Sequence, residues 1–177
     1  MPKAKYDLRI ELKNWFAGSG KVIVAGIGNP IRKDDFVGVK IVSDLQGRVP
    51  DSVILIECET VPESFIQEII ELKPSRVLLV DAAILGFKPG EARLISSEHI
   101  MDFPAITTHV LPLRIFCDYV TGSTAAKIGL LLIQPGKVEF GEGLSPEVAA
   151  AAERITGFLL ECFGSKTNVR SNNSLER

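Results

Sequence analysis

The stretch VIVAGIGNPIRKDDFVGV (residues 22–39) combines a short apolar strand, a glycine turn and the start of a helix. Val22–Ala25 is continuously apolar, which is typical of a central parallel strand buried on both faces. The apolar residues that recur with helical spacing after the turn are Val37, Ile41, Val42 and Leu45. A strand that leads through a glycine turn into a helix predicts an α/β fold.

Strands and helices alternate along most of the remaining chain. Further strands are predicted at residues 52–57, 76–81, 91–96 and 127–135, and helices from Pro62, after Pro112 and from Pro146. Ser145 is placed to cap the last helix and Gly164 to end it. We therefore expect a single α/β domain with a mostly parallel, twisted sheet of about five strands and helices on both faces. The alternating 91–96 strand is expected at an edge.

Two terminal segments differ in character from this domain. In residues 1–20, four apolar side chains are spaced to line one side of a helix: Leu8, Leu12, Trp15 and Phe16. No uninterrupted apolar core of a signal peptide is present there. We expect an amphipathic helical extension packed on the domain at residues 21–164, rather than a membrane-surface helix, because its polar face mixes acids and bases. Residues 165–177 are polar and are expected to be disordered.

Composition excludes several classes of function. The net charge is −2 and no cluster of Lys and Arg offsets it, so no nucleic-acid partner is expected. No apolar run approaches the roughly 20 residues of a membrane-spanning helix, so no membrane insertion is expected. The three cysteines, Cys58, Cys117 and Cys162, are far apart and form no CxxC pair. This usage predicts a reducing compartment, the cytoplasm. We expect a monomer.

The glycine turn resembles a nucleotide-binding loop only in part. A dinucleotide fingerprint needs G-x-G-x-x-G, and Gly26 and Gly28 fit, but Ile31 occupies the third glycine position. A carboxylate at Asp34 or Asp35 would repel a pyrophosphate, and no G-K-[ST] of a P-loop follows. Glu57, at the end of the second strand, is placed where a ribose-binding acid sits, so this interpretation is weakened and stays open.

The two adjacent acids invite different interpretations. Asp34 at a helix start can accept from free backbone N–H groups and interact favourably with the helix dipole, and for Asp34 alone we favour this structural role. Asp35 is then left for another purpose. Neighbouring helical side chains point about 100° apart, so these two acids are not expected to act as one carboxylate pair.

Three ligand-type side chains follow different strands of the predicted sheet. Asp35 lies in the turn after the first strand, Asp81 ends the third strand, and His109 lies in ITTHVLPL, between the fourth and fifth strands. In open α/β sheets, ligands bind beyond the carboxyl ends of the strands. Two carboxylates and one imidazole suit a divalent metal and leave positions open for another molecule. The imidazole binds metal when neutral, so acid should weaken binding near its ordinary pKa of about 6.5.

Other chemistries use some of the same residues. Cys58 follows the second strand and would form a Cys–His pair if His109 came within hydrogen-bond reach, although a cysteine there is more often a small buried hydrophobe. Asp35 and Asp81 could instead share one proton as an aspartic pair. Asp81 and His109 also have structural interpretations, in a turn and in a loop. No G-x-S-x-G elbow supports serine catalysis.

Several motifs in order resemble the [NiFe]-hydrogenase maturation endopeptidases. These are GIGNPIRKDDFVGV, VDA at a strand end, TTHVLPL, and LLIQP followed by FGEGLSPEV. The last two segments are most similar to the branch that processes the hydrogenase-3 large subunit. The resemblance covers about residues 22–163 and is far more specific than the glycine turn alone.

The resemblance implies a fold, an activity and a site. It implies an α/β fold with a mostly five-stranded sheet. It also implies a hydrolase, an endopeptidase that removes a C-terminal extension from the hydrogenase large-subunit precursor after nickel insertion. The family's nickel-binding residues fall on Asp35, Asp81 and His109, the same three residues that the strand ends suggest. Nickel is expected to arrive with the substrate, and no nucleotide is expected. The alternative is a metal- or nucleotide-binding α/β module without protease activity.

Two departures from the family pattern concern the expected cleft. Phe36 replaces a glycine that many members have after the second acid, and its bulk either narrows the cleft or packs. Cys58 and Glu59 replace a glycine pair after the second strand, which brings a thiol and an extra carboxylate near the cleft. With Asn29 in the first turn, these residues are the expected neighbours of the site.

Overall fold

A five-stranded sheet forms the centre of the computed structural model, which describes residues 5–100 and 110–164. Its strands are β1 (Val22–Ile27), β2 (Val53–Glu59), β3 (Arg76–Ala82), β4 (Ala92–Ser96) and β5 (Lys127–Ile133). Their order across the sheet is β2-β1-β3-β5-β4. All pairs are parallel except β4 with β5, and β4 lies at an edge. The mostly parallel sheet and the edge position of the fourth strand are confirmed.

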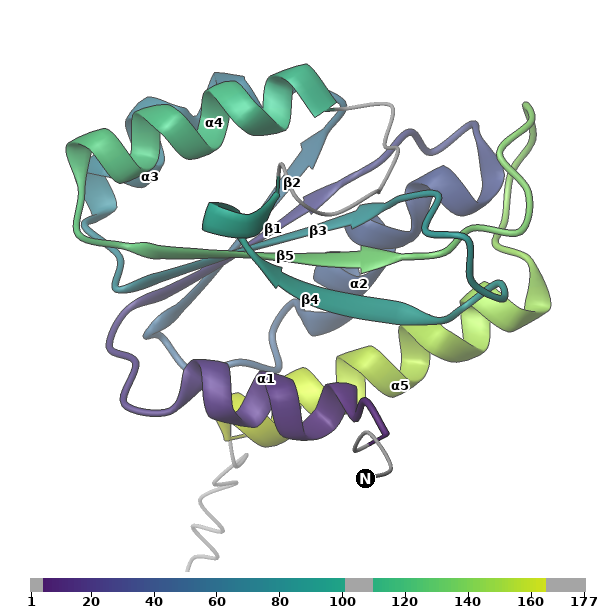
Figure 1. Ribbon diagram of the computed structural model, residues 1–177, viewed down its shortest axis with the longest axis horizontal. Helices are drawn as coiled ribbons and strands as arrows, with labels where there is room; N and C mark the ends of the chain where they lie inside the picture. Colours follow the sequence, from purple (N-terminus) through teal and green to yellow (C-terminus); the bar gives the residue numbers. More distant parts are fainter. Residues whose placement is uncertain (1–4, 101–109, 165–177) are drawn as a thin grey trace, which may run out of the picture.

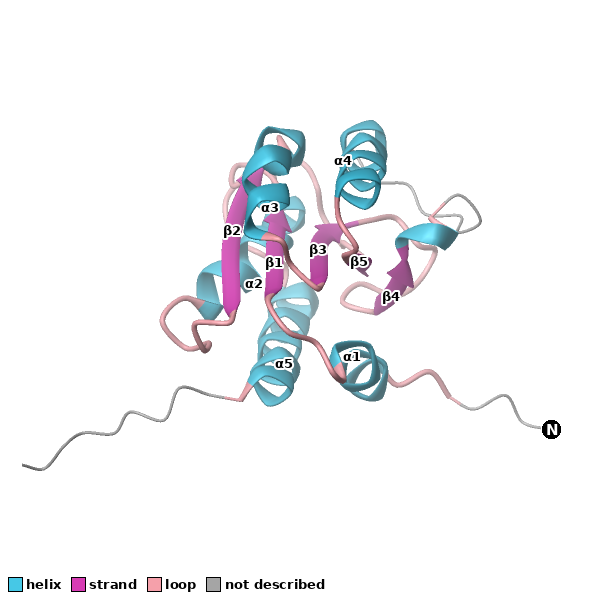
Figure 2. Ribbon diagram, turned by 90° about the vertical axis from the view of Figure 1, so that its left-hand side faces the viewer, coloured by secondary structure: helices cyan, strands magenta, loops and turns pink. Residues whose placement is uncertain are grey.

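Helices cover both faces of this sheet. The α-helices are α1 (Leu8–Phe16), α2 (Val37–Leu45), α3 (Ile66–Leu72), α4 (Val110–Ser123) and α5 (Pro146–Phe163). Short 3₁₀ helices are η1 (Lys33–Phe36), η2 (Pro62–Phe65) and η3 (Ser97–His99). Figure 2 shows α3 and α4 on one face and α1, α2 and α5 on the other. The expected arrangement of helices on both faces is therefore confirmed.

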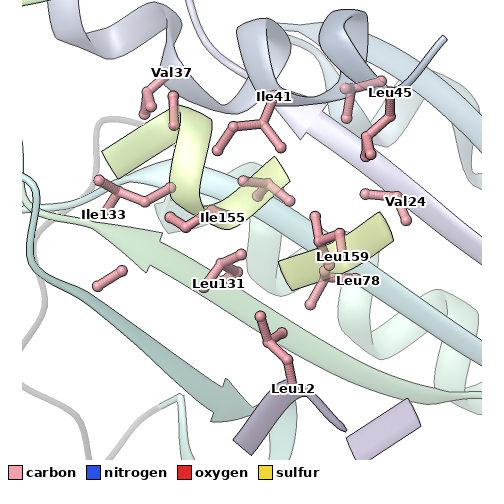
Figure 3. Packing of buried hydrophobic residues seen from close by; sticks show 14 of the residues in the cluster. Leu12, Val24, Val37, Ile41, Leu45, Leu78, Leu131, Ile133, Ile155 and Leu159 are labelled. Carbon is pink, nitrogen blue, oxygen red and sulfur yellow. The ribbon is translucent and has the colours of Figure 1, made fainter. Parts of the chain in front are cut away.

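Each face of the sheet has its own hydrophobic cluster. Alternate residues of β3 divide between them: Leu78 and Val80 face α1, α2 and α5, while Val77 and Leu79 face α3 and α4. This division follows from the two-residue period of a strand. Figure 3 shows the first cluster, where side chains of α2 and α5 meet those of the sheet, with Leu12 of α1 below them. Burial on both faces explains why the central strands are continuously apolar.

The predicted amphipathic helix near the N-terminus is α1. Asp7 caps it, since its Oδ1 accepts from the backbone N–H groups of Arg9 and Ile10 at 3.0 and 3.3 Å. Leu12 is fully buried and Phe16 nearly so, and both belong to the cluster under the sheet. The side chains of α1 therefore contribute to the main core.

Two local predictions are corrected by the structure. The second strand extends to Glu59, so Cys58 lies within β2 and not after it. Gly26 pairs with Glu57 and Ile27 with Glu59, which leaves Cys58 as the extra residue of a β-bulge. Ser145 does not cap α5 with its side chain, because its hydroxyl is bound elsewhere, to Asp34. Gly164, with φ +72°, ends that helix as expected.

In residues 5–100 and 110–164, the structure contains no helix with the length and apolar character needed to cross a membrane.

Candidate active site

The glycines of the first turn are required by close packing. A Cβ atom on Gly28, whose φ is +152°, would lie 2.0 Å from the carbonyl oxygen of Asp35. A Cβ on Gly26 would lie 2.4 Å from the carbonyl oxygen of Gly38. Real Cβ atoms do not approach backbone oxygens so closely, so these positions exclude side chains. The glycines thus let η1 and α2 lie directly against the end of β1, which explains them without a bound phosphate.

Asp35 holds the turn from within. Its side chain is nearly buried, with 5% of the residue exposed, and its Oδ2 accepts from the Asn29 N–H at 3.0 Å. Asn29 in turn accepts from the Ile31 N–H at 3.1 Å through Oδ1. In a phosphate-binding turn, backbone N–H groups point at the anion. Here a carboxylate already occupies one of them, which argues against the nucleotide alternative.

Asp81 lies near the carboxyl end of β3, in the middle of the sheet. It is fully buried in β3, and its Oδ1 accepts from the Ala82 N–H at 2.9 Å. By strand alternation its side chain falls on the face covered by α3 and α4. A buried carboxylate is costly unless charge and hydrogen bonds compensate it, so this position is chemically unusual for a strand.

Backbone packing brings the segments of Asp35 and Asp81 together. A Cβ on Gly38 would lie 2.1 Å from the carbonyl oxygen of Val80 and 2.4 Å from that of Ile27. The start of α2 therefore touches the ends of both β1 and β3, and η1 also contacts β3. The two aspartates consequently lie at the same carboxyl edge of the sheet, where open α/β folds bind ligands.

The third predicted ligand, His109, lies outside the described residues. The next residue, Val110, is the first residue of α4. Figure 1 shows that this end of α4 lies toward the carboxyl ends of the parallel strands, above the sheet. Among the described residues, no group of three or more His, Cys, Asp or Glu side chains could hold a metal ion.

Asp34 has a different role from the one predicted. It is fully buried, but its oxygens do not cap their own helix. Oδ2 accepts from the N–H groups of Gly136 and Lys137 at 2.8 and 2.7 Å and from the Ser145 hydroxyl at 2.8 Å. Oδ1 accepts from the Ser145 N–H at 2.7 Å. Asp34 therefore fastens the loop between β5 and α5 to the turn that carries Asp35.

The other expected neighbours divide into buried and exposed groups. Asn29 contacts Asp35 directly, as described above, and Phe36 follows it as a partly buried residue whose backbone packs on Gly28. Glu59 is exposed, has φ +49° and binds the Gly28 N–H through its carbonyl oxygen at 2.7 Å. Its backbone therefore supports the first turn.

Cys58 is unsuited to act as a nucleophile. Only 1% of the residue is exposed, and burial, reinforced by the charges of Glu68 and Glu63, raises the pKa of its thiol to about 12. The thiolate is the reactive form of cysteine, and at neutral pH this group is almost entirely protonated. The structure therefore disfavours the Cys–His interpretation.

Gln134 is a supporting residue that the sequence-based prediction missed. It is nearly buried after β5, and its Oε1 accepts from the Leu85 and Phe87 N–H groups at 2.7 and 3.4 Å. These bonds hold the loop that follows Asp81. In the sequence, the only sign of this role is that a glutamine stands between an apolar strand and Pro135.

A cavity of about 740 Å³ lies between α1 and α5, away from the carboxyl edge of the sheet. Its lining includes Ile10, Lys13, Phe16 and Phe158. Because the buried aspartates lie at the other end of the strands, we place the candidate active site there and not in this cavity.

The family model of HycI, the hydrogenase maturation proteases, matches residues 39–162. The hydrogenase 3 maturation protease of Escherichia coli K12 is 31% identical over 129 residues, which cover 73% of this chain and 82% of that protein. The chain belongs to the hydrogenase maturation protease family. It is therefore a peptidase, and the family's function is cleavage at the C-terminus of the hydrogenase large subunit.

Solved structures of relatives share the fold over most of this chain. The crystal structure of HycI from Thermococcus kodakarensis KOD1 has a TM-score of 0.80 and 32% sequence identity, covering 86% of this chain and 98% of that one. The solution structure of the endopeptidase HycI from Escherichia coli has a TM-score of 0.69 and 28% identity, covering 80% and 91%. The expected family, fold class and peptidase activity are thus confirmed.

Proposed function

We propose that this peptidase removes the C-terminal extension of a [NiFe]-hydrogenase large-subunit precursor after nickel insertion, and that Asp35, Asp81 and His109 bind the nickel carried by that substrate. The observation that supports this most strongly is the placement of two buried carboxylates, from separate segments, at one edge of the sheet. We place the reaction in the cytoplasm, where the free thiols Cys58, Cys117 and Cys162 would stay reduced.

The donor set suits a metal that is already partly coordinated. Two carboxylates and one imidazole supply three ligands, fewer than nickel accepts, and so leave room for thiolates of the precursor. Asp35 is oriented by its bond from Asn29, and Asp81 by its bond from Ala82. Such second-shell hydrogen bonds fix the direction in which a carboxylate presents its remaining lone pairs.

The position of α4 supports the inclusion of His109. Asp81 belongs to the strand face that α3 and α4 cover, and α4 begins one residue after His109 with its start toward the carboxyl edge. The described start of α4 therefore lies on the face and at the end of the sheet that this proposal requires.

The three residues would act by positioning. Binding the substrate's metal fixes the precursor relative to the cleft, so that the scissile bond is held in one orientation, and such preorganisation removes much of the entropic cost of reaction. A precursor without nickel lacks this anchor and should remain uncut. The aspartyl alternative, in which Asp35 and Asp81 share a proton, uses the same residues but does not require the metal.

Mass spectrometry of a nickel-loaded precursor before and after incubation tests the proposal. Asp35→Asn, Asp81→Asn and His109→Ala should each lower the cleavage rate at least 1000-fold, which corresponds to about 4 kcal/mol of barrier. Asp44→Asn is the matched control, because Asp44 is a surface acid that pairs with Lys40, one turn earlier in α2. Full cleavage of a nickel-free precursor would contradict the metal-dependent mechanism and favour the aspartyl alternative.

A further inference from the structure

Two apolar side chains project at the carboxyl edge beside the candidate active site. Ile31 is 52% exposed and Phe140 is 77% exposed, although the chain separates them by more than a hundred residues. Their backbones are adjacent, because the Gly141 N–H donates to the Ile31 carbonyl at 2.9 Å and Arg32 forms an isolated parallel bridge with Gly141. We refer to Ile31 and Phe140 as the edge pair. Figure 1 shows the two loops that carry it side by side.

The loop that carries Phe140 is firmly attached. Asp34 binds both ends of its hairpin, at Gly136 and Lys137 and at Ser145. The Lys33 N–H donates to the Gly141 carbonyl at 2.9 Å, and the Asp34 N–H to the Lys137 carbonyl at 2.9 Å. The exposure of Phe140 therefore does not result from a loosely held segment. Together with Ile31, this side chain gives a firmly attached loop an exposed apolar contact for a partner.

Side-chain contacts also attach the loop that carries Phe140, and one of them is an ion pair. The Arg32 Nε–H donates to the Val138 carbonyl at 3.0 Å, and its guanidinium lies 5.6 Å from the centroid of the Phe140 ring. Lys33 forms an ion pair with Glu139 at 2.7 Å. Aromatic and Arg side chains are enriched at the energetic centres of protein interfaces. Because Lys33 pairs with Glu139 and the Arg32 guanidinium lies near the Phe140 ring, the edge pair itself presents apolar surface to a partner.

We propose that the edge pair is a docking surface for an apolar patch on the folded body of the large-subunit precursor, separate from the nickel anchor. This inference rests on the proposed function for the identity of its partner. The reason for choosing that partner is continuity: Ile31 and Arg32 lead directly into η1, which carries both the loop anchor Asp34 and the site residue Asp35. A protein bound to the edge pair is therefore beside the candidate active site, and docking there would orient its C-terminal extension.

Binding of the nickel-free precursor, measured by biolayer interferometry, tests docking without cleavage. Ile31→Ala and Phe140→Ala should together raise Kd at least tenfold, or about 1.4 kcal/mol. Tyr119→Ala is the matched control, since Tyr119 is an exposed aromatic residue on α4, 62% exposed, and should leave Kd unchanged. Because apolar burial dominates, raising the salt from about 0.05 to 0.5 M should change Kd less than threefold, unlike an electrostatic interface.

Cleavage kinetics with the nickel-loaded precursor give a second readout. The double variant should raise KM with little change in kcat, because it removes binding that is equal in the ground and transition states. Unchanged Kd and KM would overturn the docking surface and leave the proposed function intact. Weakened binding by the double variant, with no cleavage by the parent protein, would overturn the proposed function and leave the docking surface. Loss of self-association alone would identify a second copy as the partner and overturn the proposal.

Discussion

Asp34 and Asp35 are adjacent in the chain and bind different segments. Asp34 accepts four hydrogen bonds from the loop between β5 and α5 and is fully buried. Asp35 accepts from Asn29 in its own turn and lies at the carboxyl edge. One acid therefore supports the scaffold, and the other is the one that we propose as a ligand of the site. This difference agrees with the angular separation of neighbouring helical side chains.

Only part of this division could be predicted from the residues alone. The sequence shows that two acids follow a glycine turn and that one of them suits a structural role. It does not show the partner of Asp34, because Ser145 is more than a hundred residues away in the chain. The Ser145 hydroxyl is equally suited to cap a helix. The competition between these two roles is decided by tertiary packing.

The buried thiol of Cys58 gives a prediction at the same scale. Cys58→Ala should process the precursor at the parent rate, because a thiol with a pKa of about 12 is protonated at neutral pH. The same variant should be less sensitive to alkali. An unfolded cysteine ionises near pH 9, whereas the folded one stays protonated to about pH 12, so this thiol's contribution to stability is complete below pH 9 and is lost between these values.

Urea unfolding at pH 8 and pH 10 measures that difference. The parent protein should lose about 1 kcal/mol more than Cys58→Ala over this interval. Cys162→Ala is the control, because Cys162 is only partly buried, whereas Cys58 is almost completely buried. Equal losses of unfolding free energy in the parent and in Cys58→Ala would show that the Cys58 thiol ionises in the folded protein. In the processing assay, loss of cleavage by Cys58→Ala would restore the thiol mechanism.

At the scale of elements, the site depends on how closely α2 approaches the sheet. Gly38 lets the helix start contact the ends of β1 and β3, and Gly28 lets the turn pass over the backbone of Asp35. The packing of these backbones fixes where Asp35 lies relative to Asp81. The glycines that resemble a nucleotide motif are thus explained by contact between backbone and backbone.

Gly38→Ala should displace this helix start. Its Cβ would lie 2.1 Å from the Val80 carbonyl oxygen, so the backbone must shift, at a cost of about 2–3 kcal/mol in unfolding free energy and with a large loss of processing. Gly157→Ala is the matched control. Gly157 lies inside α5 with no atom within 4 Å of a built Cβ, so alanine should stabilise by about 0.5–1 kcal/mol. A neutral Gly38→Ala in thermal unfolding would contradict this packing argument.

Elements differed in how well their sequences specified them. β1, β3 and β5 are continuous apolar runs, and their burial on both faces makes that pattern unambiguous. The end of β2 was placed two residues early, since the bulge at Cys58 breaks the regular pairing that a strand pattern assumes. The attachment of residues 136–145 to η1 could not be predicted, because most of its hydrogen bonds involve backbone groups, which every residue type provides.

At the scale of the whole molecule, α1 packs against both α5 and the sheet. Its Phe16 ring packs edge-on against Phe163 of α5, with centroids 4.9 Å apart. The Arg76 side chain at the start of β3 donates from Nε to the Trp15 carbonyl at 3.1 Å, and its guanidinium lies 5.9 Å from the Trp15 ring. Leu12 completes the cluster beneath the sheet. These contacts predict that α1 unfolds together with the rest of the protein.

Leu12→Ala should lower the unfolding free energy by about 3 kcal/mol, because it leaves a cavity in a fully buried site. Ile10→Ala, two residues away on the same helix and 54% exposed, should change it by no more than about 0.5 kcal/mol. Trp15 is the single tryptophan of the chain, so its fluorescence follows α1 while far-ultraviolet circular dichroism follows all helices and strands.

The two signals should report one coincident urea transition in the parent protein and in both variants, as a single cooperative unit requires. A fluorescence transition that precedes the circular dichroism transition would show that α1 detaches first and is an appended element. In that case Leu12→Ala would shift the fluorescence transition alone. A shift of both transitions together would instead make α1 part of the folding unit that positions the carboxyl edge, although α1 and the Asp81 side chain lie on opposite faces of the sheet.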